Sequence, residues 1–178
     1  MAYHDPLTGL ANRRLLTECV EKGVVEYRPN DAGGAILLID LDGFKAVNDK
    51  YGHEAGDAVI KEVANRLQLI TRESDIVSRI GGDEFVILTE KFDNDDVLSN
   101  EKSSILAQKI INEVSKPITY EEYSLHVGAS IGIRIYHSAH DKFESLLREA
   151  DIAMYESKKN GKGIATIFSN TLKSLSQN

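Results

Sequence analysis

The chain has 178 residues, of which 42% are apolar and 28% are charged, so it is long and apolar enough to form a globular domain with a substantial core. Its net charge of −7 argues against a general nucleic-acid-binding surface and against an anionic-membrane anchor, because neither gains from a negative field. The single cysteine, Cys19, excludes an internal disulfide and a thiolate metal cluster, and no apolar run is long enough for a membrane span.

Hydrophobic periodicity predicts helices and strands along the whole chain. Apolar side chains recur at helical spacing in several stretches, and short apolar runs bounded by turn residues predict the strands. The run over 35–39 is apolar throughout, as expected for a strand buried on both faces, and it ends in Asp40. Asp57 suits the N-cap of the third helix. In chain order we expect helices over about 15–27, 43–50, 57–70, 101–116 and 143–159, and strands over 35–39, 76–80, 85–88, 118–120, 123–136 and 164–168.

Glycines mark two places where the backbone has special requirements. Gly81-Gly82 joins strands 76–80 and 85–88 as a hairpin turn with two acids directly after it. In strand 123–136, Gly128 and Gly132 are expected at close approaches to neighbouring backbone.

The order of elements predicts an α+β fold, with a central, mostly antiparallel sheet and a βαββαβ palm-like (split-βαβ) core surrounded by helices. In that plan the first strand pairs with the second strand of the hairpin, which brings Asp40 beside Asp83 and Glu84. We expect a single domain over 1–178, ordered to about 168 and with a frayed tail over 169–178. No basic-then-apolar signal segment is present, so we expect a cytoplasmic location, although a sensory or membrane-bound region upstream would be compatible with this sequence.

The acids at this rim of the sheet predict a site for Mg²⁺ or Mn²⁺. Asp40-Leu41-Asp42 stands where a central strand opens into a pocket, and carboxylates without His or Cys select hard cations over zinc. Such a cation supports phosphoryl or nucleotidyl transfer. Either element alone has an ordinary explanation, because Gly-Gly-Asp is common turn chemistry and a strand-end acid can turn to solvent. Their convergence favours the metal.

Phosphate binding would have to depend on individual cations. The sequence has no Gly-x-x-x-x-Gly-Lys-Ser/Thr loop, which argues against a P-loop nucleoside triphosphatase. Lys45, Lys158 and Lys162 are the candidates, although for each lysine alone a solvated surface position is the ordinary interpretation.

Long stretches of the chain resemble the GGDEF domain, the catalytic module of bacterial diguanylate cyclases. The matching stretches follow the family's order and read DPLTGLANRR (5–14), DLDGFKAVNDKYGHEAGD (40–57), RIGGDEF (79–85), ASIG (129–132) and ADIAMY (150–155), continuing to Lys158. The resemblance implies a nucleotidyltransferase of bacterial signal transduction. In such an enzyme two GTP molecules, one on each domain of a facing homodimer, condense to cyclic di-GMP and two pyrophosphates. It also implies Mg²⁺ (or Mn²⁺) as cofactor.

The resemblance assigns the catalytic and metal-binding roles position by position. Asp40, the Leu41 carbonyl and Asp83 are implied metal ligands. Asp83 and Glu84 are the implied catalytic residues, with Asp83 as a candidate base for the 3′-hydroxyl and the division of labour between them left open.

The implied substrate-binding residues are Phe44, Lys45, Asn48, Asp57, Lys158 and Lys162. Among them, Asn48 and Asp57 read the guanine edge, which suits an amide and a carboxylate. Lys162 stands where the family more often has Arg, and Gly163 where Asn or Asp is usual. The charge is kept at position 162, but the bidentate fork of a guanidinium is lost.

Arg72 and Asp75 lie at the distance before Gly81-Gly82 where the family has its inhibitory product site. Their ordinary interpretation is a solvated ion pair. The resemblance instead implies that Arg72 contacts phosphate or guanine of cyclic di-GMP and that Asp75 pairs with a guanine donor edge, with Arg79 adding to the site.

Three functions are compatible with this sequence. The leading interpretation is an active diguanylate cyclase with product feedback. The alternative is a catalytically weak GGDEF domain that binds GTP or cyclic di-GMP as a regulator, but such domains usually have an altered hairpin tip, and this tip is intact. A nucleotide cyclase or polymerase with a similar palm-like sheet is the third, and Asn48 and Asp57 favour the dinucleotide product over it.

Overall fold

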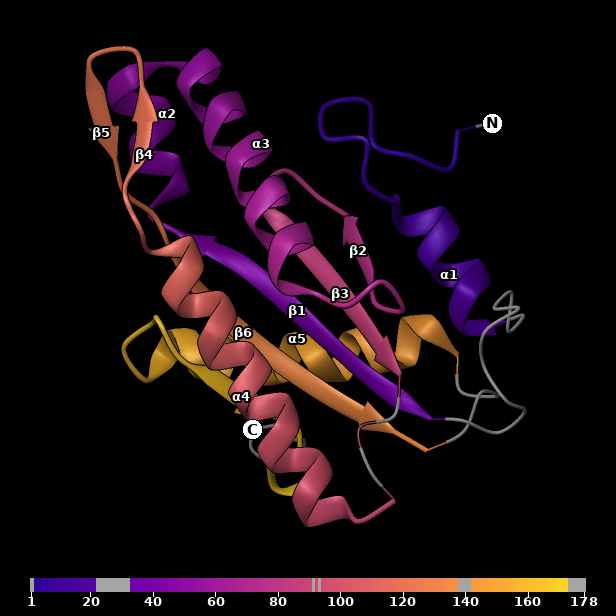
Figure 1. Cartoon of the computed structure of the whole chain (residues 1–178). Coiled ribbons are helices and arrows are strands. Elements are labelled where there is room, and N and C mark those ends of the chain that lie inside the picture. The colour runs from indigo at the N-terminus through magenta and orange to yellow at the C-terminus, as the bar shows by residue number, and fades with distance from the viewer. Residues whose placement is uncertain (1, 22–32, 91, 93, 138–141, 173–178) are drawn as a thin grey trace.

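A five-stranded sheet with helices on both faces forms the centre of the molecule (Figure 1). The computed structural model describes residues 2–21, 33–90, 92, 94–137 and 142–172. Within these ranges no helix is long and apolar enough to cross a membrane. The elements are α1 (Arg13–Glu21), β1 (Gly34–Asp42), α2 (Phe44–Tyr51), α3 (His53–Ile70), β2 (Ile76–Arg79), β3 (Glu84–Glu90), α4 (Asp96–Val114), β4 (Ile118–Tyr120), β5 (Tyr123–Leu125), β6 (Gly128–Tyr136), α5 (Phe143–Lys159) and β7 (Ala165–Ile167).

The strand order of the sheet is β2-β3-β1-β6-β7, and every pair is antiparallel except β6 with β7. The predicted fold class is therefore confirmed, and so is the predicted antiparallel pairing of β1 with β3. This pairing sets Asp40 opposite Glu84 on one side and opposite Ser130 of β6 on the other. The end of the central strand thus meets the start of the hairpin's second strand.

Side chains of β1 alternate between two apolar layers, because successive residues of a strand point to opposite faces. Leu37 and Ile39 pack with apolar residues of α3 and α4, whereas Ile36 and Leu38 pack with those of α1 and α5. Figure 1 shows α3 and α4 on the near side of the sheet and α5 on the far side. All four β1 side chains are at most 2% exposed, and each such burial is worth about 1.5–3 kcal/mol. The strand is buried on both faces, as predicted.

Helix α5 lies against β6 at Gly132, as the sequence predicted for a close approach. A Cβ at this position would lie 1.9 Å from the Ala150 carbonyl oxygen and 2.4 Å from the Met154 nitrogen. At Gly128 a Cβ would meet only side-chain atoms of Asp42, at 3.4 Å. The close backbone approach therefore depends mainly on Gly132.

Three predicted boundaries are wrong. Helix α3 begins at His53 with Gly52 as its N-cap, so Asp57 lies in the second turn and does not cap the helix. Helix α4 begins at Asp96, inside the predicted loop, because the Asp95 side chain accepts a hydrogen bond from the Leu98 amide and caps it. The predicted strand over 123–136 is divided into β5 and β6, and β5 pairs with β4 in a separate two-stranded sheet.

Two other expectations fall partly outside the described residues. The first predicted helix was expected to reach 27, and α1 is described to Glu21. The tail was expected to fray from 169, and 170–172 form a helical turn at the end of the described part.

We expect Gly132→Ala to lower the free energy of unfolding by about 2 kcal/mol or more, because the new methyl group meets backbone atoms of α5 that cannot rotate away. Guanidinium chloride unfolding measures this change. Gly82→Ala is the matched control, since a Cβ there meets nothing within 4 Å, and its effect should stay within about 0.5–1 kcal/mol. Equal losses in the two variants would contradict the packing argument.

Candidate active site

Four carboxylates gather where β1 ends, and we call Asp40, Asp42, Asp83 and Glu84 the acidic rim. Asp40 and Asp42 lie on the α5 face of β1, and Glu84 is paired with Asp40 in the register of the sheet. The Leu41 amide donates to the Asp83 carbonyl oxygen at 3.2 Å, which attaches the hairpin tip to the end of β1. The predicted meeting of Asp40, Asp83 and Glu84 is thus present in the structure.

Lys158 of α5 supplies the positive charge at the acidic rim. Its Nζ lies 3.1 Å from Asp40 Oδ2 and 3.1 Å from Asp42 Oδ1. Burial lowers the pKa of Lys158, but the hydrogen bonds to the two carboxylates outweigh it and leave the pKa raised. Lys158 therefore stays protonated at neutral pH.

The carboxylates of the acidic rim disfavour one another's charge. Burial raises the pKa of Asp40, and the nearby charge of Asp83 adds to this effect, while Lys158 opposes it. Burial also raises the pKa of Glu84, with further contributions from Asp40, Asp151 and Asp83, and Arg13 opposes them. A cation bound at the rim would relieve this repulsion.

The donors of the rim fit a hard cation, although they do not form a ready-made cluster. Within the described residues no three His, Cys, Asp or Glu side chains converge closely enough to hold a metal ion. Asp40 Oδ1, however, is buried and has no hydrogen-bond partner among the described residues. Asp83 is near enough for its charge to raise the pKa of Asp40. An unpaired buried carboxylate oxygen next to a second carboxylate is the kind of donor set that Mg²⁺ binds.

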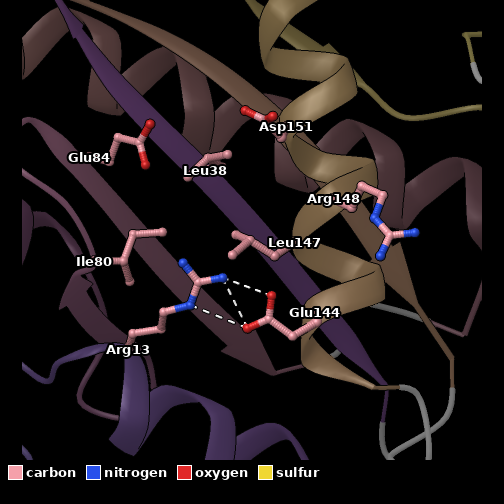
Figure 2. Close-up of a pocket in the computed structure, with 8 residues that line it drawn as sticks. All are labelled: Arg13, Leu38, Ile80, Glu84, Glu144, Leu147, Arg148 and Asp151. Atoms are coloured by element: carbon pink, nitrogen blue, oxygen red, sulfur yellow. Dashed lines mark hydrogen bonds and ion pairs between the residues drawn. The ribbon is translucent and has the colours of Figure 1, made fainter. Parts of the chain in front are cut away.

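A cleft of about 260 Å³ extends from Glu84 along the α5 face of the sheet toward α1 (Figure 2). One wall carries the ion pair between Arg13 Nη2 and Glu144 Oε2, at 2.7 Å. Its lining mixes both charges with apolar side chains and consists of Arg13, Leu38, Ile80, Glu84, Glu144, Leu147, Arg148 and Asp151. Glu84 thus faces space that a ligand can enter.

The predicted guanine-reading residues lie on the two helices that follow β1. Asn48 of α2 packs directly over Gly56 of α3, where a Cβ would lie 1.8 Å from Asn48 Oδ1. Phe44 reaches the same place, 3.3 Å from that Cβ position, and Asp57 follows Gly56 as an exposed residue of α3. Asn48 therefore lies against the residue that precedes Asp57. Gly56 was not singled out from the sequence, because its contact with Asn48 depends on how α2 and α3 cross.

The other two lysines that were predicted to bind phosphate differ in their surroundings. Lys45 is exposed on α2. Lys162 lies in the turn after α5, with a positive φ of 64°, and its amide donates to the Ser157 carbonyl oxygen at 3.1 Å. The amide of the next residue, Gly163, donates to Asp42 Oδ2 at 3.2 Å.

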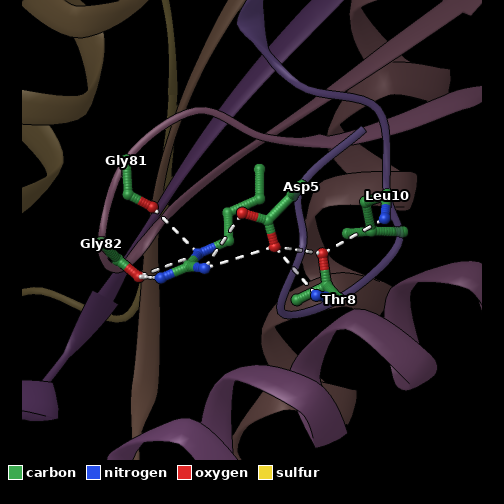
Figure 3. A network of polar contacts seen from close by, with 6 residues as sticks. Asp5, Thr8, Leu10, Gly81 and Gly82 are labelled. Carbon is green, nitrogen blue, oxygen red and sulfur yellow. Dashed lines mark hydrogen bonds and ion pairs between the residues drawn. The ribbon is translucent and has the colours of Figure 1, made fainter. Parts of the chain in front are cut away.

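Figure 3 shows the N-terminal turn, with Asp5 and Thr8, beside the Gly81-Gly82 turn. Arg79 links the two turns through its guanidinium. Arg79 donates from Nε to the Gly81 carbonyl at 3.1 Å, from Nη2 to the Gly82 carbonyl at 2.9 Å and from Nη1 to Asp5 Oδ1 at 3.2 Å. Burial raises the pKa of Asp5, but hydrogen bonds from Thr8 and the charge of Arg79 outweigh it, so the pKa is lowered. Asp5 is therefore a permanent partner for Arg79 at neutral pH.

The predicted product-site residues lie at opposite ends of β2. Asp75 Oδ2 accepts from the Arg72 amide at 2.9 Å, and the Arg72 side chain is exposed. Arg79 is four residues beyond Asp75, or about 13 Å along an extended strand. The structure thus brings Arg72 and Asp75 together and directs Arg79 to the hairpin turn.

Comparisons with known proteins match the chain to one protein family over most of its length. The family model for the diguanylate cyclase GGDEF domain matches residues 2–163. The bifunctional diguanylate cyclase/cyclic di-GMP phosphodiesterase MucR of Pseudomonas aeruginosa is 37% identical over 177 residues, which are 99% of this chain and 25% of MucR. The chain therefore spans a quarter of that relative's length.

Solved structures give the same result over nearly the whole chain. The GGDEF domain of TpbB (YfiN) from Pseudomonas aeruginosa superposes with a TM-score of 0.81 and 31% identity, covering 98% of this chain and 99% of that one. The GGDEF domain of DgcB from Caulobacter crescentus, solved in complex with c-di-GMP, has a TM-score of 0.80 and 25% identity, covering 94% and 96%.

We expect Glu84→Gln to raise the melting temperature of the metal-free protein at pH 7.5 by about 1–3 °C, because it removes a half-buried charge that is repelled by its neighbours. Since the folded-state pKa of Glu84 is raised, the protonated side chain stabilises the fold at low pH and this contribution is lost as pH rises through that pKa. The advantage of Gln should therefore shrink on acidification.

Thermal melts from pH 4 to pH 8 in chelator measure the difference between Glu84→Gln and the wild type. Glu101→Gln, which removes an exposed charge from α4, is the control. A Glu84→Gln variant that melts below the wild type at pH 7.5 would show that the charge repulsion is not the dominant effect.

Proposed function

Since the chain belongs to the diguanylate cyclase GGDEF-domain family, we propose that it is a diguanylate cyclase, which condenses two molecules of GTP to cyclic di-GMP and two pyrophosphates. The observation that supports this most is the intact hairpin tip, whose Asp83 and Glu84 lie beside Asp40 at the open end of the central strand. The name of the relative MucR includes diguanylate cyclase, together with cyclic di-GMP phosphodiesterase.

The acidic rim is the proposed reaction centre. Asp40, Asp83 and the Leu41 carbonyl would hold Mg²⁺ (or Mn²⁺), which neutralises phosphate charge and lowers the pKa of a bound hydroxyl. Asp83 or Glu84 accepts the proton of the attacking 3′-hydroxyl. The raised pKa of Glu84 makes its carboxylate a stronger base than that of an ordinary glutamate.

The remaining predicted residues bind the nucleotide. Asn48 and Asp57 pair with the guanine edge, with Phe44 packed beside them, and this is supported by the contact of Asn48 with Gly56. Lys158 contacts the phosphates from the rim, and Lys45 and Lys162 add further positive charge. Each domain holds one GTP, so catalysis requires a homodimer in which two sites face each other. We place this reaction in the cytoplasm.

The direct test is to incubate the protein with Mg²⁺ and GTP, with ATP in parallel, and to identify products by mass. We expect cyclic di-GMP from GTP alone. Asp83→Ala should lower its rate of formation by about 10²-fold or more, because the variant loses a metal ligand and candidate base. Asp49→Ala, which removes an exposed acid of α2, is the control and should keep wild-type turnover.

The outcomes separate the candidate functions. GTP binding without product would identify a binding regulator rather than a cyclase. Near wild-type turnover of Asp83→Ala, with an unchanged melting curve, would refute the assignment of this residue.

We also propose that cyclic di-GMP inhibits by binding Arg72 and Asp75, away from the acidic rim, where it would hold domains in an unproductive arrangement. The exposure of the Arg72 side chain supports this. Arg72→Ala should weaken cyclic di-GMP binding by about tenfold or more, as expected for loss of a charge-assisted contact, and should raise the inhibitory concentration in parallel.

Calorimetry with cyclic di-GMP and initial rates with GTP measure the two effects. Lys109→Ala on α4 removes an exposed positive charge elsewhere and should change neither quantity. Equal product affinity and equal inhibition of wild type and Arg72→Ala would leave Arg72 as an ordinary surface residue.

A further inference from the structure

Asp42 is the most highly connected carboxylate of the acidic rim, and the roles considered so far do not use it. Its side chain is 12% exposed and lies between three structural elements. Oδ1 accepts from Ser130 Oγ at 2.9 Å and from Lys158 Nζ at 3.1 Å, while Oδ2 accepts from Ser130 Oγ at 2.8 Å and from the Gly163 amide at 3.2 Å. One carboxylate thus joins β1, β6, α5 and the turn after α5.

Each oxygen of Asp42 faces one group that can only donate, Lys158 at Oδ1 and the Gly163 amide at Oδ2. A protonated lysine and a backbone amide can only donate, so the group between them must accept on both sides. An Asn at this position would have to direct its NH₂ toward either Lys158 or Gly163 and would lose that contact. The geometry therefore requires a carboxylate and not merely a polar side chain of the same shape.

The two contacts hold two candidate phosphate-binding lysines, Lys158 in the last turn of α5 and Lys162 in the turn after the helix. Lys158 is fixed directly through its ammonium group. Lys162 is fixed through the backbone, because it and Gly163 have positive φ values of 64° and 66° and the Gly163 amide is tied to Asp42. Lys158 has three N–H donors, of which two point to Asp40 and Asp42. The third stays available for a phosphate oxygen.

We propose that Asp42 is a positioning residue, which sets Lys158 and the Lys162 turn for the phosphate chain of a nucleoside triphosphate without touching the nucleotide itself. When a cation occupies Asp40, Asp42 is the partner that keeps Lys158 in place. This inference rests on the proposed function, since the ligand is the triphosphate of that reaction. Ser130 supports it by donating to both oxygens of Asp42.

A competing effect has the opposite sign and makes the proposal testable. Removing a negative charge from the rim reduces its repulsion of the phosphates. If Asp42 acted only through its charge, the neutralised variant would bind the triphosphate more tightly than the wild type. If Asp42 positions the lysines, the variant would bind the triphosphate more weakly. The direction of the change in affinity after Asp42→Asn distinguishes the two.

The probe is 3′-deoxy-GTP with Mg²⁺, because it lacks the attacking hydroxyl and cannot react, and 3′-deoxyguanosine is its counterpart without phosphates. NMR titration measures both dissociation constants. Asp42→Asn should weaken 3′-deoxy-GTP by about tenfold or more, as for loss of a charge-assisted contact, and should leave 3′-deoxyguanosine within about twofold. Asp49→Asn, an exposed acid of α2, is the matched control and should change neither.

Ser130→Ala is the second variant, because it keeps the charge of Asp42 and removes the hydroxyl that donates to Asp42 and accepts from the Gly163 amide at 3.3 Å. It should weaken 3′-deoxy-GTP in the same direction by a smaller factor, and it decides the question if Asp42→Asn fails to fold. Unchanged or tighter binding of 3′-deoxy-GTP overturns the positioning role. An equal loss of affinity for 3′-deoxy-GTP and for 3′-deoxyguanosine also overturns it. If the wild type does not bind 3′-deoxy-GTP at all, the proposed function fails and this role with it.

Discussion

The repulsion among the carboxylates at the end of β1 is the constraint on which the candidate site depends. Two like charges 4 Å apart in a protein surface repel by about 4 kcal/mol at an effective dielectric near 20. The rim holds four carboxylates, and Lys158 contacts two of them, Asp40 and Asp42. The fold tolerates this repulsion because the apolar side chains of β1 are buried on both faces and the strand pairs on both sides. The stability of the central strand thus offsets the cost of a rim that favours a cation, as functional sites commonly require.

The fold was largely predictable because its signals are local and strong. A continuous apolar run such as 35–39 is typical of a strand in the middle of a sheet, and the split-βαβ plan then determines which strands lie beside it. The errors occurred where a short-range signal was missed. Gly52 starts α3 one turn early, since its φ of 93° turns the chain without a side-chain cap, and Asp95 starts α4 within a charged segment that looked like a loop. In neither case did hydrophobic periodicity mark the boundary.

The site was predictable where the pairing of strands brings residues together. It was not predictable where contacts depend on how side chains of distant elements meet. Asp40 and Glu84 meet because β1 and β3 are neighbours. Asp42 meets Ser130, Lys158 and Gly163 across 88 to 121 positions of sequence, and only the full three-dimensional arrangement shows it. A signal was nevertheless present, because Asp42 is two residues from Asp40 and must share its face of the strand. The sequence carried no comparable sign of the contact between Gly56 and Asn48, since a glycine within a helical pattern need not pack against another element.

Arg79 shows that one charged residue cannot be assigned to two tasks without cost. All three of its nitrogens already donate, to Asp5 and to the carbonyls of Gly81 and Gly82. A product phosphate at Arg79 would have to share the guanidinium with these three acceptors, and two of them belong to the turn that presents Asp83. Arg72 carries no such cost, because its side chain is exposed at the other end of β2. Product binding through Arg72 would therefore leave the contacts of the hairpin turn untouched, whereas binding through Arg79 would compete with them.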